Sequence, residues 1–272
     1  MKGDRALRVA VLVSGGGTNL QALLDRQAAG TLAAEIVVVA ADRSDAFGLV
    51  RAERAGVPAH VVDYAHYLKS PFDELPPLPS GVDLEALDAR QRILETTDRA
   101  RRLERLKRLV LAEEALINAL EEYRPDVVCL AGFMRLVSPH FIKHFNREGR
   151  RRILNIHPAL LPAFPGQHGY EDTFAYGCKW GGITVHFVDE GEDTGPIIAQ
   201  AVYPLWPGDS VDDVRRRGLE LEYLVYAQCL NWLAAGEIRL EKDEEPSGRL
   251  RAMITDPRYR TILEEWAAKA FS

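Results

Sequence analysis

The first 64 residues alternate short apolar runs with helical patterns, and this alternation restricts the possible folds more than any other feature. Apolar runs at 6–13, 34–41 and 58–64 have the length and β-branched content of buried strands. Helical patterns lie between them at 18–30 and 47–56, and each ends in a glycine. Strands joined through helices favour a parallel sheet that is covered by those helices.

The same alternation returns in the second half of the chain. A helix followed by a strand is expected within 113–133, and another strand over 152–158. Two further strands are expected at 182–190 and 197–205, before a long amphipathic helix at 211–236. The sequence therefore predicts an α/β fold, a doubly wound, mostly parallel sheet with helices on both faces.

Residues 70–110 interrupt this pattern. They begin with a proline-rich stretch and continue as a charged helical stretch, which indicates an insertion or a lengthened helix on the surface. Its basic run at 99–108 is more typical of a solvated helix face than of an anion or partner site. We expect residues 1–240 to form one domain that includes this insertion, and 241–272 to form a C-terminal extension ending in a short helix.

Composition excludes several classes of function. The 272 residues carry a net charge of −6, which argues against a nucleic-acid partner. No apolar run approaches the ~18 residues that span a bilayer, so no membrane association is expected. Cys129, Cys178 and Cys229 lack metal-ligand or redox spacing, which indicates reduced thiols, no metal and a cytoplasmic location.

The stretch "LNIHPALLPAFPG" at 154–166 places two polar side chains at the end of an apolar run. If that end is extended, Asn155 and His157 point to one face, and the prolines that follow stiffen the next loop. Strand ends are where open α/β sheets build their sites. A strand histidine beside an ordinary proline-rich turn is the alternative interpretation.

A glycine-rich turn follows the first predicted strand. "SGGGTNL" lets backbone N–H groups approach a ligand at a helix N-terminus, which suits a phosphate. Gly17, Thr18 and Asn19 are the candidate contacts. The pattern is neither a Walker motif nor a dinucleotide fingerprint, so a tight turn without a ligand remains open.

Two other segments carry candidate groups. "LAGFMRLVSP" at 130–139 provides an apolar wall with one cation, and "VHFVDEGEDTGPIIAQ" at 185–200 provides a carboxylate-rich turn between two strands. A carboxylate near an imidazole can orient it and hold a proton on it. Core packing with Arg135 at the surface, for the first, and a hydrophilic hairpin loop, for the second, are the alternatives. We expect His186 to be a strand residue rather than a catalyst, and the histidines at 60, 66, 140 and 144 to be structural or exposed.

Taken in order, these strings resemble the phosphoribosylglycinamide formyltransferases, a family of folate-dependent formyltransferases. The strings are "VAVLVSGGGTNLQALLD", "DAFGLVRAERAG", "PDVVCLAGFMRLVSP", "ILNIHPALLPAFPG" and "GITVHFVDEGEDTGPIIAQ", and the resemblance covers most of residues 7–240. Asn-Ile-His-Pro and the Asp-x-Gly-Pro turn, in this order after the glycine-rich loop, are its most specific parts.

The resemblance implies roles for particular residues. Its catalytic trio maps to Asn155, His157 and Asp193, with Asp193 keeping His157 cationic. Its substrate phosphate and ribose contacts map to Gly17, Thr18, Asn19 and Glu222. Its folate pocket maps to Phe133, Met134, Arg135, Leu136, Val137, Val188 and Asp189, and His168 falls near the site.

The resemblance also implies the substrates, 5′-phosphoribosylglycinamide and the cosubstrate 10-formyltetrahydrofolate, with no metal. The partners are then small molecules, and the protein is a monomer or homodimer. Two features depart from the family pattern. Glu192 stands where the family usually has an apolar residue. In the family a basic residue near the 70–110 segment reaches the substrate phosphate, and the extra length of that segment here leaves its equivalent unassigned. Lys69 or an arginine of the charged helix are candidates.

Three alternatives share parts of this pattern. A formyltetrahydrofolate hydrolase would use water as acceptor, and other formyltransferases act on a different amine. The hydrolase usually has a further domain before this one, and we expect no such domain ahead of Val9. A non-catalytic folate or nucleotide binding protein would have no need of the trio.

Overall fold

The computed structural model describes residues 5–242 and 249–271, and its centre is a seven-stranded sheet in the order β3-β2-β1-β4-β5-β6-β7. The strands are β1 (Leu7–Val13), β2 (Ala34–Ala41), β3 (Ala59–Val61), β4 (Val127–Leu130), β5 (Ile153–His157), β6 (Trp180–Phe187) and β7 (Ile197–Pro204). The first five strands run parallel to one another, whereas β6 is antiparallel to both β5 and β7. The predicted doubly wound, mostly parallel sheet is confirmed.

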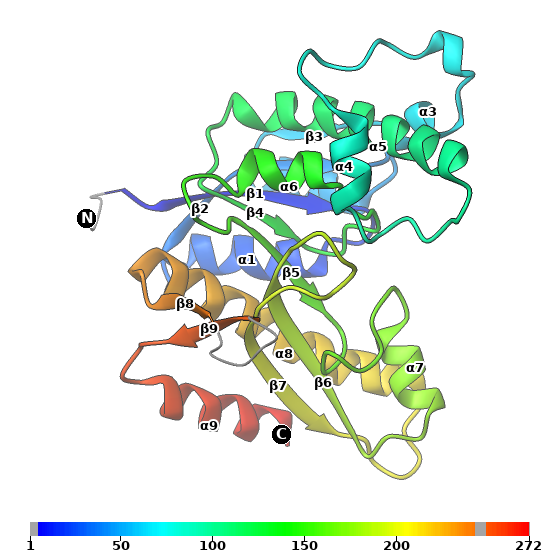
Figure 1. The fold of residues 1–272 in the computed structure, drawn as a ribbon. Helices are drawn as coiled ribbons and strands as arrows, with labels where there is room; N and C mark the ends of the chain where they lie inside the picture. The colour runs from blue at the N-terminus through cyan, green and yellow to red at the C-terminus, as the bar shows by residue number, and fades with distance from the viewer. Residues whose placement is uncertain (1–4, 243–248, 272) are drawn as a thin grey trace.

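Helices cover both faces of this sheet, as Figure 1 shows. The helices are α1 (Thr18–Ala28), α2 (Phe47–Arg54), α3 (Tyr64–Lys69), α4 (Leu84–Arg90), α5 (Arg99–Glu121), α6 (Pro139–Phe145), α7 (Gly169–Ala175), α8 (Val211–Ala235) and α9 (Tyr259–Ala270). In β1, Val9 and Val11 pack in the core with α1 and α8, whereas Ala10 and Leu12 pack in the core with α5 and α6. This alternation follows from the two-residue period of a strand, so a strand buried on both faces is apolar throughout.

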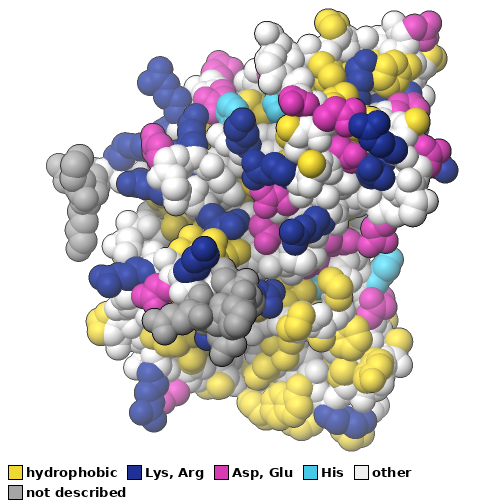
Figure 2. Space-filling view, viewed as in Figure 1, with side chains coloured by type: hydrophobic (Ala, Val, Ile, Leu, Met, Phe, Trp, Pro, Cys, Tyr) yellow, Lys and Arg dark blue, Asp and Glu magenta, His cyan; other side chains and the backbone are white. Residues whose placement is uncertain are grey.

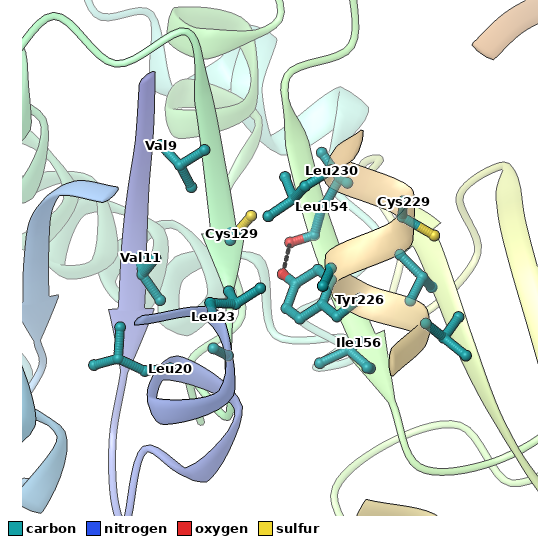
Figure 3. Packing of buried hydrophobic residues seen from close by; sticks show 14 of the residues in the cluster. Val9, Val11, Leu20, Leu23, Cys129, Leu154, Ile156, Tyr226, Cys229 and Leu230 are labelled. Carbon is teal, nitrogen blue, oxygen red and sulfur yellow. Dashed lines mark hydrogen bonds between the residues drawn. The ribbon is translucent and has the colours of Figure 1, made fainter. Parts of the chain in front are cut away.

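Helix α8 lies across the middle of the sheet and is also joined to it by hydrogen bonds. The Tyr226 hydroxyl donates to the carbonyls of Leu130, 3.0 Å away, and Leu154, 3.2 Å away. Figure 3 shows Tyr226 directed at Leu154 between the apolar side chains of β4 and β5. The predicted core position of Cys129 is confirmed, because its side chain is fully buried in the same cluster.

Chain order reverses between β1 and β4, which lie side by side although more than 100 residues separate them. The loops that follow these two strands meet there, because the Ser14 amide donates to the Gly132 carbonyl at 3.0 Å. Ligands of open α/β sheets bind at such a reversal, outside the carboxyl ends of the strands. The topology therefore places the glycine-rich turn and the 131–138 loop at the expected edge.

The 70–110 region combines both expected forms. A short 3₁₀ turn (Phe72–Glu74) and α4 lie before α5, and α5 extends the expected helix back to Arg99. Figure 2 shows acidic and basic side chains interspersed over this part of the surface, which agrees with a solvated face. Several charged side chains of the region form ion pairs with one another, such as Arg99 with Glu85.

The C-terminal region differs from the expectation in one respect. A hairpin of β8 (Ile238–Lys242) and β9 (Leu250–Ile254) precedes α9, and the sequence pattern had indicated only the helix. Helix α9 packs on the main core through Trp266, whose ring lies 5.8 Å from that of Trp232. Two strands are also shorter than expected: β3 ends at Val61, and β6 ends at Phe187 instead of continuing to 190.

Candidate active site

Asn155 and His157 lie on one face of β5, as the alternation predicted. They share that face with Ile153, which packs in the core beside α5 and α6. Beyond β5 the proline-rich loop is held by Thr184, whose hydroxyl donates to the Ala159 carbonyl at 2.7 Å. The loop folds back so that the Phe164 carbonyl lies 2.7 Å from Nε2 of His157.

Asp193 reaches these two side chains through the connection between β6 and β7. Strand β6 is antiparallel to β5, and its last residue, Phe187, pairs with Leu154 near the start of β5. Residues 188–196 must therefore fold back along β5 to reach His157 at its end. Glycine is required at 195, where a Cβ would lie 1.7 Å from the Phe187 carbonyl oxygen. Asp193 itself adopts a φ of 53°, a conformation uncommon outside glycine and typical of constrained sites.

The Asp193 carboxylate then bridges several polar groups. Its Oδ2 lies 3.2 Å from Nδ1 of His157 and accepts from the Gly166 amide at 2.8 Å. Its Oδ1 lies 3.4 Å from Nδ2 of Asn155. The structure thus brings the predicted trio together in one cluster.

His186 is a member of this cluster that the sequence interpretation missed. It lies in β6 opposite Asn155, and its Nε2 is 3.4 Å from Oδ1 of Asp193 and 3.3 Å from the Asn155 amide nitrogen. Its alternation with apolar neighbours indicated a strand residue, which is correct. The period-2 pattern alone could not reveal that Asp193 folds back onto it.

Burial and charge act in opposite directions on the two main titratable groups. Burial lowers the pKa of His157 below its usual 6.5, although Asp193 and the Phe164 carbonyl oppose this shift. Burial raises the pKa of Asp193, but His186, His157 and the Gly166 amide outweigh it, so the pKa is lowered. Asp193 is therefore ionised at neutral pH, while burial disfavours the charged form of His157. That Asp193 keeps His157 cationic stays a prediction, in which the Asp193 charge must outweigh the effect of burial on the pKa of His157.

A cavity opens beside the cluster and brings together the two halves of the predicted folate pocket. Its walls include Asn155, His157, His186 and Asp193, together with Phe133, Met134, Arg135, Leu136, Val137, Val188, Asp189 and Ile93. The Arg135 guanidinium is not free, because it pairs with buried Asp42 at 2.5 Å. The predicted apolar wall is therefore present, while the cation beside it is already neutralised.

The glycine-rich turn lies at the start of α1. Gly17 has a φ of 65°, which favours glycine, and a Cβ there would also come within 2.7 Å of the Gly48 Cα. Both the backbone conformation and the close approach therefore require glycine at this position. The sequence interpretation missed a basic residue at this turn. Arg51 of α2 donates to the Gly16 carbonyl at 2.7 Å and to Gln21 at 2.9 Å. Arg51 is part of the motif "FGLVRAERAG", but only the tertiary fold places its guanidinium beside the glycine-rich turn.

Asn19 and Glu222 meet in a second buried cluster beside this turn. The Asn19 amide donates to Glu222 at 2.5 Å, and the Tyr170 hydroxyl of α7 donates to the other carboxylate oxygen. Oδ1 of Asn19 is buried without a partner among the described residues. Burial raises the pKa of Glu222, and its two donors offset this only in part.

The remaining candidates lie outside these clusters. His168 is exposed at the start of α7, next to Gln167 of the cavity wall. Lys69 ends α3, which packs against α5. Within residues 5–242 and 249–271, no group of His, Cys, Asp and Glu side chains is arranged to hold a metal ion. None of the helices described there is long and apolar enough to cross a membrane.

Comparison with known proteins identifies the family. Residues 7–230 match the family model described as formyl transferase. The phosphoribosylglycinamide formyltransferase of Escherichia coli (strain K12) is 34% identical over 237 residues, which are 87% of this chain and 92% of that protein.

Solved structures agree with this match. Glycinamide ribonucleotide transformylase 1 from Symbiobacterium toebii superposes with a TM-score of 0.70 at 37% identity, covering 93% of this chain and 96% of that one. A formyltetrahydrofolate deformylase from Pseudomonas syringae pv. tomato str. DC3000 shares the fold, with a TM-score of 0.67 at 20% identity over 93% of this chain and 67% of that chain. The chain belongs to the formyl transferase family.

Proposed function

We propose that this protein transfers the formyl group of 10-formyltetrahydrofolate to the amine of 5′-phosphoribosylglycinamide, a step of purine biosynthesis. The observation that carries the proposal is the position of Asp193, within 3.4 Å of both His157 and Asn155 at the wall of one cavity. The identity to relatives of that name over most of the chain supports the choice of acceptor.

In the proposed reaction the amine attacks the formyl carbon directly, without a covalent enzyme intermediate. Negative charge develops on the formyl oxygen, where the Asn155 amide and protonated His157 would donate hydrogen bonds. Asp193 would stabilise the cationic imidazole and relay the proton lost by the amine, through water, to N10 of the folate as the carbon–N10 bond breaks.

His157 must be protonated to donate to the formyl oxygen. Its Nε2 is directed at the Phe164 carbonyl and its Nδ1 at Asp193, so both ring nitrogens face acceptors, an arrangement that only the imidazolium satisfies fully. We infer that the developing oxyanion supplies the second negative charge that raises the pKa of His157 during the reaction.

The acceptor half of the site would hold the phosphorylated ribose. The glycine-rich turn offers backbone N–H groups at the start of α1, with Arg51 adjacent. Glu222 and the unpartnered Oδ1 of Asn19 are acceptors suited to ribose hydroxyls. The cavity walls at 133–137 and 188–189 would hold the folate.

A hydrolase that uses water as the acceptor is the second candidate, favoured by the fold shared with a deformylase. We expect the protein to act on small molecules in the cytoplasm, as a monomer or homodimer. All three cysteines are free thiols, which supports that location.

An acceptor-dependence assay tests the proposal. Purified protein is mixed with 10-formyltetrahydrofolate, or its 10-formyl-dideaza analogue, with and without phosphoribosylglycinamide, and release of the deformylated folate is followed. Release only with the amine is the expected result. Release without it would establish a hydrolase, and no release in either mixture would point to a different amine or to a binding protein.

A further inference from the structure

Residues 90–93, which begin at the last residue of α4, lie against the loop that carries Asp193. The Arg92 amide donates to the Glu190 carbonyl at 2.9 Å, and Arg92 forms an isolated bridge with Gly191. The Arg90 guanidinium forms an ion pair with the Glu190 carboxylate. We call residues 90–93 the strap, because they join the lengthened region to the catalytic loop through both backbone and side chain.

The strap is held firmly at its other side. Asp88, just before it in α4, accepts two hydrogen bonds from Arg102 of α5, at 2.7 and 2.8 Å, and its side chain is only 8% exposed. The Gln91 side chain accepts from the amides of Ile93 and Leu94, at 3.0 and 2.8 Å. Residues 88–93 therefore contact both α5 and the loop that carries Asp193.

Ile93 extends this contact into the site itself. Its side chain is 8% exposed, packs in the same core as Phe133 and Val188, and lines the cavity that contains His157. An apolar side chain on the wall of a cavity shapes what binds there, since a flat ring must pack against it.

Charge on the loop favours its contact with the strap. Burial works against the charged form of Glu190, but the Arg90 hydrogen bond and the charge of Arg151 outweigh it, and the pKa is lowered. Glu190 is therefore ionised at neutral pH beside the Arg90 guanidinium. Partial burial and the nearby Asp193 charge instead raise the pKa of Glu192, two residues on.

We propose that the strap is a positioning and specificity element: Arg90 and the Arg92 backbone fix the 188–193 loop so that Asp193 meets His157, and Ile93 forms a wall for the formyl donor's heteroaromatic ring. This inference rests on the proposed function and names residues outside the catalytic cluster. It predicts that the lengthened region controls the use of the formyl donor and has no effect on binding of the amine.

Ile93→Ala tests the wall. Removing part of an apolar wall is expected to raise KM for the formyl donor about tenfold, with KM for the amine unchanged. Ile93→Val provides a milder step, expected near twofold, that preserves folding if the alanine variant does not fold. Arg99→Gln is the matched control, since it breaks an ion pair of the same region, with Glu85, and touches neither the cavity nor the 188–193 loop among the contacts described.

Arg90→Gln tests the positioning. We expect amide hydrogen exchange of the 188–194 loop to become severalfold faster and kcat to fall severalfold, with no change in Arg99→Gln. Exchanging the pair, Arg90→Glu with Glu190→Arg, should restore both values toward those of the wild type, which a general loss of stability would not.

The outcomes separate this inference from the proposed function. A wild-type protein that transfers no formyl group would overturn the function. An active wild type whose KM for the formyl donor is unchanged in Ile93→Ala and Ile93→Val, and whose loop exchange is unchanged in Arg90→Gln, would overturn the strap alone.

Discussion

Asp193 is partly buried and Glu222 is fully buried, one in each half of the site, and their pKa values shift in opposite directions. Asp193 faces two imidazoles and a backbone amide, and these lower its pKa in spite of burial. Glu222 accepts from an amide and a phenol, which offset the effect of burial only in part, so its pKa rises. Groups that can become cationic stabilise a buried carboxylate more than neutral donors do.

The opposite pKa shifts indicate different roles for the two carboxylates. A carboxylate that remains ionised can stabilise a cationic imidazole and accept a proton during the reaction. A carboxylate whose pKa is raised by burial, beside an amide oxygen that has no partner among the described residues, is suited to exchanging hydrogen bonds with hydroxyl groups. We therefore assign chemistry to the cluster of Asp193 and binding to the cluster of Glu222.

The largest effect is expected from the oxyanion donors. Asn155→Ala or His157→Ala should lower kcat by about two to three orders of magnitude, since one lost donor costs about 3–4 kcal/mol in comparable sites. Steady-state kinetics measure this, with His144→Gln as control because His144 of α6 pairs with Glu121 of α5. A rate within threefold of the wild type in either alanine variant would remove the chemical half of the comparison.

A smaller effect is expected at the other cluster. Tyr170→Phe removes one donor to Glu222 and should raise KM for the phosphorylated amine by about tenfold, the value of a hydrogen bond of roughly 1–1.5 kcal/mol. KM for the formyl donor should not change. Tyr176→Phe is the control, because that ring is 79% exposed. An unchanged KM for the amine in Tyr170→Phe would argue against a binding role.

Glu113 is a further carboxylate that, like Glu222, is buried among neutral partners. It is fully buried, accepts from the Ser138 amide and hydroxyl, and burial raises its pKa to about 8. The folded state keeps a proton that the unfolded state loses near pH 4.5, so this contribution to stability falls as pH rises from about 4.5 through about 8.

Glu113→Gln should therefore reduce the loss of Tm between pH 6 and pH 8.5 by several degrees. Thermal unfolding of this variant is compared with that of the wild type and of Glu122→Gln, an exposed neighbour at the end of α5. An equal loss of Tm in all three proteins would contradict the raised pKa.

The most subtle test concerns His157. Its pKa, read from the ring proton shifts by NMR, should lie below 6.5 in the ligand-free protein, because burial is the largest influence. Asp193→Asn should lower it further, since the aspartate charge opposes burial. The corresponding stability is present above about pH 6.5 and is lost as pH falls through the lowered pKa. A pKa that rises in the variant would mean that Asp193 does not face the ring as a charge.

Local patterns were sufficient for the sheet and for part of the site. Continuous β-branched runs predicted β2 at its observed bounds, and strand alternation placed Asn155 and His157 on one face. These inferences succeed because each depends on residues within one element. Asp193 came from the family resemblance, since nothing local brings a loop back over a sheet.

The residues that were missed depend on tertiary contacts. His186 joins the cluster only because β6 runs antiparallel beside β5, and Arg51 reaches the glycine-rich turn from a different helix. Ile93 lies in a segment whose composition indicated a surface insertion, and only its packing shows that it borders the cavity. The β8–β9 hairpin follows a helix and has short, half-exposed strands, so its apolar signal is weak.

The most direct measurement compares Asp193→Asn with Glu222→Gln in the same steady-state assay with both substrates varied. The account predicts that Asp193→Asn lowers kcat by roughly three orders of magnitude with KM for the amine within threefold of the wild type. It predicts the reverse for Glu222→Gln, a KM for the amine raised about tenfold with kcat within threefold. A loss of kcat as large in Glu222→Gln as in Asp193→Asn, or a purely KM effect in Asp193→Asn, would contradict the division of labour between the two carboxylates.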